Sequence, residues 1–221
     1  MPEVSGPLDQ EILTTSSPWG IPVRVVDETG STNDDLLALG EKGAPAGTLL
    51  FAERQTAGRG QFRRHWSSAR GLGIWCSLLL RMDVSDATIP SLSAFPAVAL
   101  VETLQLLGIR GHGIKAPNDI LIDGRKIAGI LVETRTGRDP YAVIGIGLNV
   151  NHAPGGFPEE LKDRAVSLTM LTGRLFDRTS VAAVLIEELA KAGRLMQEAP
   201  GELLAAWDSH LLPAQTVNPE S

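Results

Sequence analysis

Cysteine is nearly absent from this sequence: Cys76 is the single one among 221 residues. One cysteine cannot form an internal disulfide, and no cysteine and histidine cluster has the spacing of a zinc site. The cytoplasm is therefore the expected compartment. Cys76 lies in an apolar run, and we interpret it as a small core residue on a strand.

Long hydrophobic runs are also missing. The longest, such as residues 127–132, fall well short of the roughly 20 residues that cross a bilayer. The first twenty residues hold no basic segment followed by an apolar stretch, so no signal peptide is expected. We expect no membrane partner.

Positive charge is scarce too, because 20 lysines and arginines face 26 aspartates and glutamates, for a net charge of −6. Non-specific binding to nucleic acid needs a basic face that displaces counterions. The stretch ahead of the first motif is also too short for a helix-turn-helix. We expect no nucleic-acid partner.

The composition is that of a globular protein, with 43% hydrophobic and 21% charged residues. The length fits one large domain. We expect a loose leader at residues 1–20, in which serines and a proline break any periodic pattern, one domain at 21–209, and a short tail at 210–221.

The hydrophobic pattern predicts an α+β fold. Thr32 is expected to cap the first helix, Pro96 to lie in or near the first turn of the second, and Asp123-Gly124 to turn a hairpin. Strands gather in the middle with helices outside, which favours a mixed sheet packed with helices. Strands are expected at residues 21–26, 48–52, 73–81, 120–122, 126–133 and 141–148, and helices at 31–40, 91–107 and 181–196, with a shorter piece to 207.

A polar loop rich in glycine and arginine occupies residues 53–66. Gly58 and Gly60 flank Arg59, and glycine lets backbone N–H groups approach an anion. Arginine at such a turn can hold a phosphate or carboxylate with two donors. An ordinary basic surface loop explains the pattern about equally well.

Residues 114–133 hold a second polar segment. Lys115 lies two residues before a proline, so it is expected in extended chain, and Asn118 and Asp119 prefer turns. Alone, this segment is typical of a turn with an exposed lysine.

Two further segments are polar at the ends of regular elements. Residues 143–151 form an apolar strand that Gly145 and Gly147 interrupt, and glycine weakens a strand unless a close neighbour needs it. Residues 30–33 lie where a strand meets a helix, so they can cap the helix and also bind a neutral polar ligand.

In their order along the chain, these segments resemble the catalytic domain of the biotin protein ligases. The resemblance covers about residues 21–207 and implies a mixed sheet related to that of class II aminoacyl-tRNA synthetases. The matching segments are Gly30-Ser-Thr-Asn33, Gln55-Thr-Ala-Gly-Arg-Gly60 through Trp66, Lys115-x-Pro-Asn-Asp119, Gly124-Arg-Lys-Ile-Ala-Gly-Ile-Leu-Val-Glu133 and Gly145-Ile-Gly-Leu-Asn-Val-Asn151.

The resemblance implies a two-step reaction that uses ATP and Mg²⁺. The carboxylate of biotin attacks the α-phosphate of ATP, which yields biotinyl-5′-AMP and pyrophosphate. A lysine amine of a biotin carboxyl carrier domain then takes the biotin. No metal site built from protein ligands alone is expected, since the magnesium arrives with ATP.

The resemblance also assigns roles to residues. Lys115 is expected to be the main catalytic residue, because its ammonium can bring two anions together and stabilise charge at phosphorus; Arg59 is expected to assist it. Gly129 and Gly147 would leave a flat strand face for biotin, and Asp119 would help with the metal or the incoming amine. The residues expected at biotin are Ser31, Thr32, Asn33, Gln55, Gly58, Arg59, Lys115 and Gly129, and those expected at ATP or the adenylate are Arg59, Gly60, Gln61, Trp66, Asn118, Lys126 and Asn149.

The sequence departs from the family pattern at several points. Gln61 stands where the family usually has arginine, Arg63 where it has glycine, and Ala116 where it has tryptophan. Only 14 residues follow Trp207, so the small C-terminal β-barrel domain of the family is expected to be missing. Two other functions stay open, a lipoate or octanoate ligase or transferase of the same superfamily, and a non-catalytic biotin-binding relative.

Overall fold

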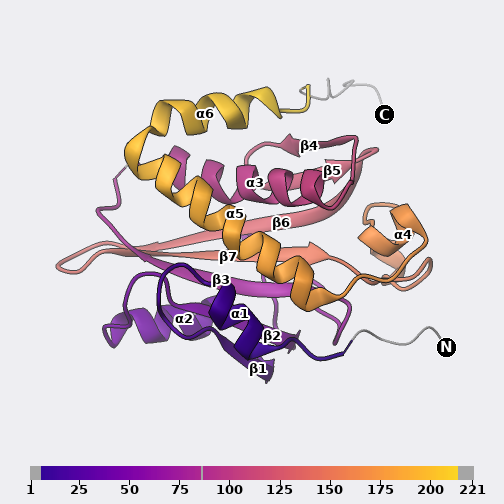
Figure 1. Cartoon of the computed structure of the whole chain (residues 1–221), viewed down its shortest axis with the longest axis horizontal. Helices are drawn as coiled ribbons and strands as arrows, with labels where there is room; N and C mark the ends of the chain where they lie inside the picture. The colour runs from indigo at the N-terminus through magenta and orange to yellow at the C-terminus, as the bar shows by residue number, and fades with distance from the viewer. Residues whose placement is uncertain (1–5, 86, 214–221) are drawn as a thin grey trace.

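A seven-stranded sheet forms the centre of the computed structural model, which describes residues 6–85 and 87–213 (Figure 1). The strand order is β1-β2-β3-β7-β6-β5-β4. β1 and β2 run parallel, and the other neighbours in this sheet run antiparallel. The predicted α+β class with a mixed sheet is confirmed.

The predicted elements occur in the predicted order, and the strand predicted at 21–26 begins three residues later. The strand His112–Lys115 and the helices Gln10–Ser16 and Leu168–Thr172 were not predicted. The strands are β1 (Arg24–Thr29), β2 (Leu49–Gln55), β3 (Gly73–Arg81), β4 (His112–Lys115), β5 (Asp119–Ile122), β6 (Arg125–Arg135) and β7 (Tyr141–Asn149). The helices are α1 (Gln10–Ser16), α2 (Thr32–Glu41), α3 (Ile89–Leu106), α4 (Leu168–Thr172), α5 (Arg178–Glu198) and α6 (Pro200–Ser209), with short 3-10 turns at Gln61–Arg63 and Glu159–Leu161.

The two faces of the sheet bury different side chains. Because successive residues of a strand point to opposite faces, Cys76 and Leu78 of β3 join the large core under α3 and α5, whereas Leu79 packs in a smaller cluster with Leu36 of α2. Figure 1 shows α3 and α5 on one side of the sheet and α2 on the other. The face that α2 covers is the one that carries the candidate site.

The hairpin predicted at Asp123-Gly124 is confirmed. Both residues have positive φ, at 50° and 74°, which is the conformation that a two-residue hairpin of this twist requires. It joins β5 to β6, and β6 pairs with β7 from Ala128 to Arg135.

Two local predictions about helices are wrong. Ser31, and not Thr32, is the N-cap of α2, so Thr32 is the first helical residue. Pro96 lies inside α3 because the helix begins earlier than predicted, at Ile89, with Pro90 in its first turn. Among the described helices, α3 alone has the length and hydropathy of a membrane span, and 67% of that stretch is buried inside the fold.

The segment predicted to be a loose leader is folded from residue 6 onward. Asp9 caps α1 by accepting from the backbone N–H groups of Glu11 and Ile12 at 2.9 and 3.0 Å. Leu8 and Leu13 are buried. The prediction overlooked this capping aspartate between two core leucines, and residues 1–5 lie outside the described part of the chain.

The tail predicted at 210–221 is described as far as residue 213. Its first residues follow β4, since the N–H of Ile114 donates to the carbonyl of His210 at 2.7 Å and that of Leu212 to the carbonyl of Ile114 at 2.8 Å. The outer edge of β4 is therefore partly covered by the chain that follows α6.

A buried ion pair joins the N-terminal segment to the sheet and to α5. Arg178 is 1% exposed, and its Nη2 lies 2.7 Å from Oε2 of Glu53 on β2. The same nitrogen donates to the carbonyl of Gly6 at 2.8 Å, while the other oxygen of Glu53 accepts from the N–H of Leu8 at 2.6 Å. Three distant segments thus share one set of charge-assisted hydrogen bonds.

We expect Arg178→Met to lower the free energy of unfolding by about 3–5 kcal/mol, because Glu53 would stay buried without its partner. Urea unfolding measures this loss. Arg54→Met is the matched control: its pair with Glu28 is exposed, so it should cost less than about 1 kcal/mol. Equal losses in the two variants would contradict the importance of the buried pair.

His152 follows β7 and is buried between aromatic rings. It stacks on Phe157 with 4.1 Å between ring centroids and meets Trp75 edge-on at 6.2 Å. Neither ring nitrogen has a hydrogen-bond partner among the described residues. Burial lowers the pKa of His152 from 6.5 to about 4, so the folded protein holds this ring neutral.

The stability of the fold should therefore decrease in mild acid. Since the pKa of His152 is lower in the folded chain than in the unfolded one, its contribution is complete above pH 6.5 and is lost as the pH falls towards 4, by up to about 1.4 kcal/mol per pH unit. His152→Leu removes the titrating group, so its free energy of unfolding should change less over this range. Identical pH profiles for the two proteins would show that the burial of His152 does not contribute.

Candidate functional site

The candidate site is a pocket over the middle strands, on the face that α2 covers. Its floor lies on β6 and β7, where Gly129 pairs with Gly147 and Leu131 with Gly145. Its walls come from the start of α2, the end of β2 and the loop after it. The pocket is lined by Ser31, Thr32, Asn33, Gln55, Arg59, Gly60, Trp66, Cys76, Asn118, Lys126, Gly129, Ile130, Leu131, Gly145, Ile146 and Gly147.

The glycines of the floor are needed because side chains from other elements lie directly on the strands. A Cβ on Gly145 would stand 2.3 Å from Oδ1 of Asn33, and one on Gly147 would stand 2.4 Å from the indole of Trp66. A Cβ on Gly129 would also meet Trp66, at 2.8 Å. The glycines in the strand indicated close neighbours, and these neighbours are Asn33 and Trp66. The indole of Trp66 lies on the strand face that was expected to be open for biotin.

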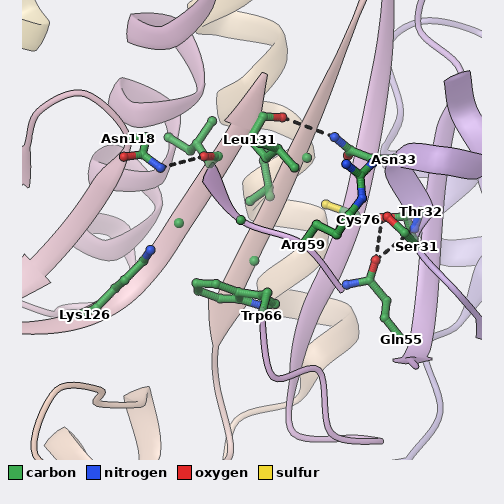
Figure 2. A pocket seen from close by; sticks show the side chains of 16 residues that line it. Ser31, Thr32, Asn33, Gln55, Arg59, Trp66, Cys76, Asn118, Lys126 and Leu131 are labelled. Atoms are coloured by element: carbon green, nitrogen blue, oxygen red, sulfur yellow. Dashed lines mark hydrogen bonds between the residues drawn. The ribbon is translucent and has the colours of Figure 1, made fainter. Parts of the chain in front are cut away.

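A neutral hydrogen-bond network forms one end of the pocket (Figure 2). Oε1 of Gln55 accepts from the N–H and the hydroxyl of Thr32 at 2.9 and 3.1 Å. The hydroxyl of Ser77 lies 2.7 Å from that of Thr32 and 2.6 Å from Oδ1 of Asn33. Ser77 was not predicted, and its place in a long apolar strand carries no signal of this role.

Arg59 lies beside this network between two carboxylates. Its guanidinium donates to both oxygens of Glu133, at 3.2 and 3.0 Å, and to Asp34. Burial acts to lower the pKa of Arg59, but the hydrogen bonds and charges of Glu133 and Asp34 outweigh it and raise that pKa. Asn33 donates to Glu133 at 2.8 Å, so one carboxylate connects the arginine to the neutral network. No residue pattern had predicted this role for Glu133 or Asp34.

Lys126 provides a second cation on the other side of Trp66 (Figure 2). Its Nζ lies 2.6 Å from Oδ1 of Asp119 and 4.9 Å from the centre of the indole ring. The indole therefore separates the two cations of the pocket, and each cation has a carboxylate partner.

A β-bulge turns Lys126 toward the pocket. Leu121 pairs with Lys126 and Ile120 with Ala128, so one residue of β6, Ile127, is extra. Ile127 and Ala128 are both buried in the core. In a regular strand, residues 126 and 128 would share a face, so alternation without the bulge would place Lys126 on the core face with Ala128.

Lys115 does not line this pocket, and its predicted catalytic role stays a prediction. Lys115 is exposed at the end of β4, the edge strand, and β5 separates β4 from β6. Ala116, where the family pattern has tryptophan, is exposed beside it.

Most of the other predicted residues line the pocket, and four of the predicted set do not: Lys115, Gly58, Gln61 and Asn149. Gly58 supports Trp66, since its carbonyl accepts from the N–H of Trp66 at 2.9 Å. Gln61 starts the turn at the tip of the loop. Asn149 is buried and donates to the carbonyl of Lys126 at 3.3 Å. The side chain of Arg63 lies outside the described part of the chain.

Cys76 reaches the pocket lining from the core. It is 1% exposed, and burial raises the pKa of its thiol to about 12. The thiol therefore stays protonated at neutral pH, in keeping with the interpretation of Cys76 as a core residue on a strand.

Comparisons with known proteins show the family of this chain. Residues 25–151 match the model of the biotin/lipoate A/B protein ligase family. The bifunctional ligase/repressor BirA of Bacillus subtilis is 44% identical over 157 residues, which are 70% of this chain and 48% of that protein. The chain thus spans about half the length of this relative.

Two further relatives match over a larger share. The biotin–[acetyl-CoA-carboxylase] ligase of Mycobacterium tuberculosis is 36% identical over 206 residues, which cover 83% of this chain and 70% of that protein. The biotin protein ligase of Aquifex aeolicus, solved with biotin and ATP, has a TM-score of 0.73 and 28% identity, and covers 87% of this chain and 79% of its own. This chain belongs to the biotin/lipoate A/B protein ligase family.

Proposed function

We propose that this chain is a biotin protein ligase, which joins biotin to AMP and then transfers it to a lysine of an acceptor protein. One observation carries the proposal: a single glycine-floored pocket combines a neutral hydrogen-bond network with two cations, Arg59 and Lys126. The named relatives support it, as does the likeness to a ligase solved with biotin and ATP.

The neutral network suits the ureido ring of biotin. That ring is uncharged and offers both N–H donors and a carbonyl acceptor, which Thr32, Asn33 and Gln55 can satisfy with their hydroxyl and amide groups. A buried polar ring needs such partners, since an unpaired donor or acceptor costs about 1–3 kcal/mol. The glycines leave room for the ring close to the strands once the indole of Trp66 shifts.

The two cations suit the first chemical step. An oxygen of the biotin carboxylate forms a bond to the α-phosphorus of ATP, and the bond from that phosphorus to the oxygen bridging to the β-phosphate breaks, so pyrophosphate leaves with its electron pair. Both reactants are anions that repel each other. Lys126 and Arg59 can offset this repulsion and the charge that develops at phosphorus.

The carboxylate partners fix the positions of these two cations before any substrate binds. Asp119 keeps Lys126 at 2.6 Å, and Glu133 keeps Arg59 at 3.0 Å. The phosphate and carboxylate of the substrates would then take up donors that already point into the pocket, which limits the entropy lost on binding. We therefore assign to Lys126 the main catalytic role that the sequence had favoured for Lys115.

The second step transfers biotin to the acceptor. The amine of the acceptor lysine attacks the carbonyl carbon of the mixed anhydride, an amide forms, and AMP leaves. Trp66 and the loop that precedes it can cover the anhydride and keep water away from it. We propose a biotin carboxyl carrier domain as the acceptor and the cytoplasm as the compartment.

Magnesium is proposed to accompany ATP. Among residues 6–85 and 87–213, no group of three or more histidine, cysteine, aspartate or glutamate side chains could hold a metal ion. Mg²⁺ commonly binds through one or two carboxylates plus the substrate phosphates, and Asp119 is the carboxylate beside Lys126. When bound, the ion would neutralise phosphate charge.

The experiment that tests this function is pyrophosphate release by the purified chain with MgATP and biotin, without any acceptor. Biotin-dependent release supports the ligase. Release with lipoate or octanoate in place of biotin would transfer the assignment to that branch of the family. Biotin binding without any release would identify a non-catalytic relative.

The two lysines provide a direct prediction. Lys126→Ala should lower the rate of biotin-dependent pyrophosphate release by about 10²–10³, the usual effect of losing one donor at a developing charge. Lys115→Ala should stay within about twofold of the unchanged protein, because Lys115 is exposed on the edge strand. Thermal unfolding of both variants serves as the control for folding. The opposite order of the two rates would restore Lys115 to the central role.

A further inference from the structure

Ser77 places a hydroxyl underneath the neutral network of the pocket. It is 0% exposed in the middle of the apolar strand β3, and it does not itself line the pocket. Cys76 and Leu78 on either side of it point into the large core, so alternation along the strand directs Ser77 to the face that α2 covers. A buried hydroxyl costs free energy unless it is hydrogen-bonded, and the partners of Ser77 lie at the start of α2.

The hydrogen of the Ser77 hydroxyl is directed at Asn33. Nδ2 of Asn33 donates to Glu133 at 2.8 Å, and this carboxylate, which is paired with Arg59, only accepts. Oδ1 of Asn33 therefore faces the other way and lies 2.6 Å from the hydroxyl of Ser77. Since Oδ1 carries no hydrogen and a hydroxyl carries one, Ser77 donates to Asn33, and the oxygen of Ser77 remains an acceptor.

The hydroxyl of Thr32 has one hydrogen and two acceptors within reach. It lies 3.1 Å from Oε1 of Gln55, the contact drawn in Figure 2, and 2.7 Å from the hydroxyl of Ser77. Oε1 of Gln55 also accepts from the N–H of Thr32 at 2.9 Å, so both of its lone pairs are occupied while the hydroxyl donates to it. If the hydroxyl of Thr32 turns its hydrogen to Ser77 instead, one lone pair of Gln55 becomes free.

The amide of Gln55 is oriented from its other end. Nε2 donates to the hydroxyl of Ser68 at 2.8 Å, and that hydroxyl lies 3.4 Å from the carbonyl of Trp66. A carbonyl can only accept, so Ser68 donates to it and accepts from Gln55. Gln55 lines the pocket with its oxygen on the side of Thr32, and the group that its freed lone pair can bind is an N–H.

We propose that Ser77 is a positioning residue that favours a ligand ring with N–H groups, because it takes the hydrogen of Thr32 and so frees Gln55 to accept from the ligand. This inference rests on the proposed ligase function and adds to it a reason for the choice of ring. The ureido ring of biotin carries N–H groups, whereas the dithiolane ring of lipoate and the alkyl chain of octanoate carry none. No proton leaves any residue in this exchange, since one hydrogen bond of Thr32 replaces another.

Calorimetric titration with biotin and steady-state pyrophosphate release test the proposal together. Ser77→Ala removes the alternative acceptor, so the Kd and the KM for biotin should each rise about tenfold, the effect expected when one buried donor or acceptor loses its partner. The KM for ATP and the rate at saturating biotin should stay within about twofold, because the lost interaction belongs to biotin binding alone. Equal increases in the two KM values would show a general loosening of the pocket and contradict the proposal.

A double-mutant cycle checks that Ser77 acts through Thr32. Thr32→Val removes the hydroxyl that occupies Gln55, so the exchange is no longer needed. In that background, Ser77→Ala should change the Kd for biotin by less than about threefold, since the two residues belong to one network. Additive losses in the double variant would exclude the route through Thr32.

Thr103→Ala is the matched control. Thr103 is also 0% exposed, and its hydroxyl donates to the carbonyl of Ala99 at 2.7 Å within α3, on the side of the sheet away from α2. Its melting temperature should fall at least as far as that of Ser77→Ala, because it loses a buried methyl group as well, while its Kd for biotin should not change.

An unchanged Kd for biotin in Ser77→Ala would overturn the proposal, as would an equal rise in Thr103→Ala. Biotin binding by the unchanged protein without any pyrophosphate release would contradict the ligase function alone. The titration does not depend on turnover, so these two failures are distinguishable.

Discussion

The close packing of Asn33 and Trp66 on the glycines of β6 and β7 is the constraint on which the site depends. A methyl group at Gly145 or Gly147 would meet atoms at 2.3–2.4 Å, well inside van der Waals contact. Because these positions are bare, α2 and the loop after β2 come down onto the sheet. Their approach brings the neutral network and Arg59 to the same pocket as Lys126 of β6.

Each of the two cations that line the pocket forms an ion pair with a carboxylate. Asp119 holds Lys126, and Glu133 with Asp34 holds Arg59. Such pairs are preorganised and only partly buried, so in the proposed reaction a substrate phosphate would replace a carboxylate at a lower cost than that of ordering a free side chain. The buried ion pair of Arg178 and Glu53 has a structural role instead. It is sealed from solvent and joins the N-terminal segment to β2, the strand that ends at Gln55.

Much of the fold followed from local patterns. The Asp123-Gly124 hairpin and β3 were predicted within a residue, because turn chemistry and a continuous apolar run are local signals. The helix α1 was not predicted. It is stabilised by the burial of Leu8 and Leu13 against distant parts of the core, and this burial is not visible in the local sequence. The place of Pro96 was also missed, because the start of α3 is set at Pro90.

By itself, the sequence determined the α+β class, the family resemblance and most of the pocket lining, because each rests on residue types at short spacing. Only the tertiary structure decided which lysine faces the pocket. Lys115 and Lys126 are the same residue type and both lie in family motifs, but the β-bulge at Ile127 turns Lys126 toward the site while strand order leaves Lys115 at the edge. Side-chain direction in a sheet depends on pairing register, and register is a property of two strands together.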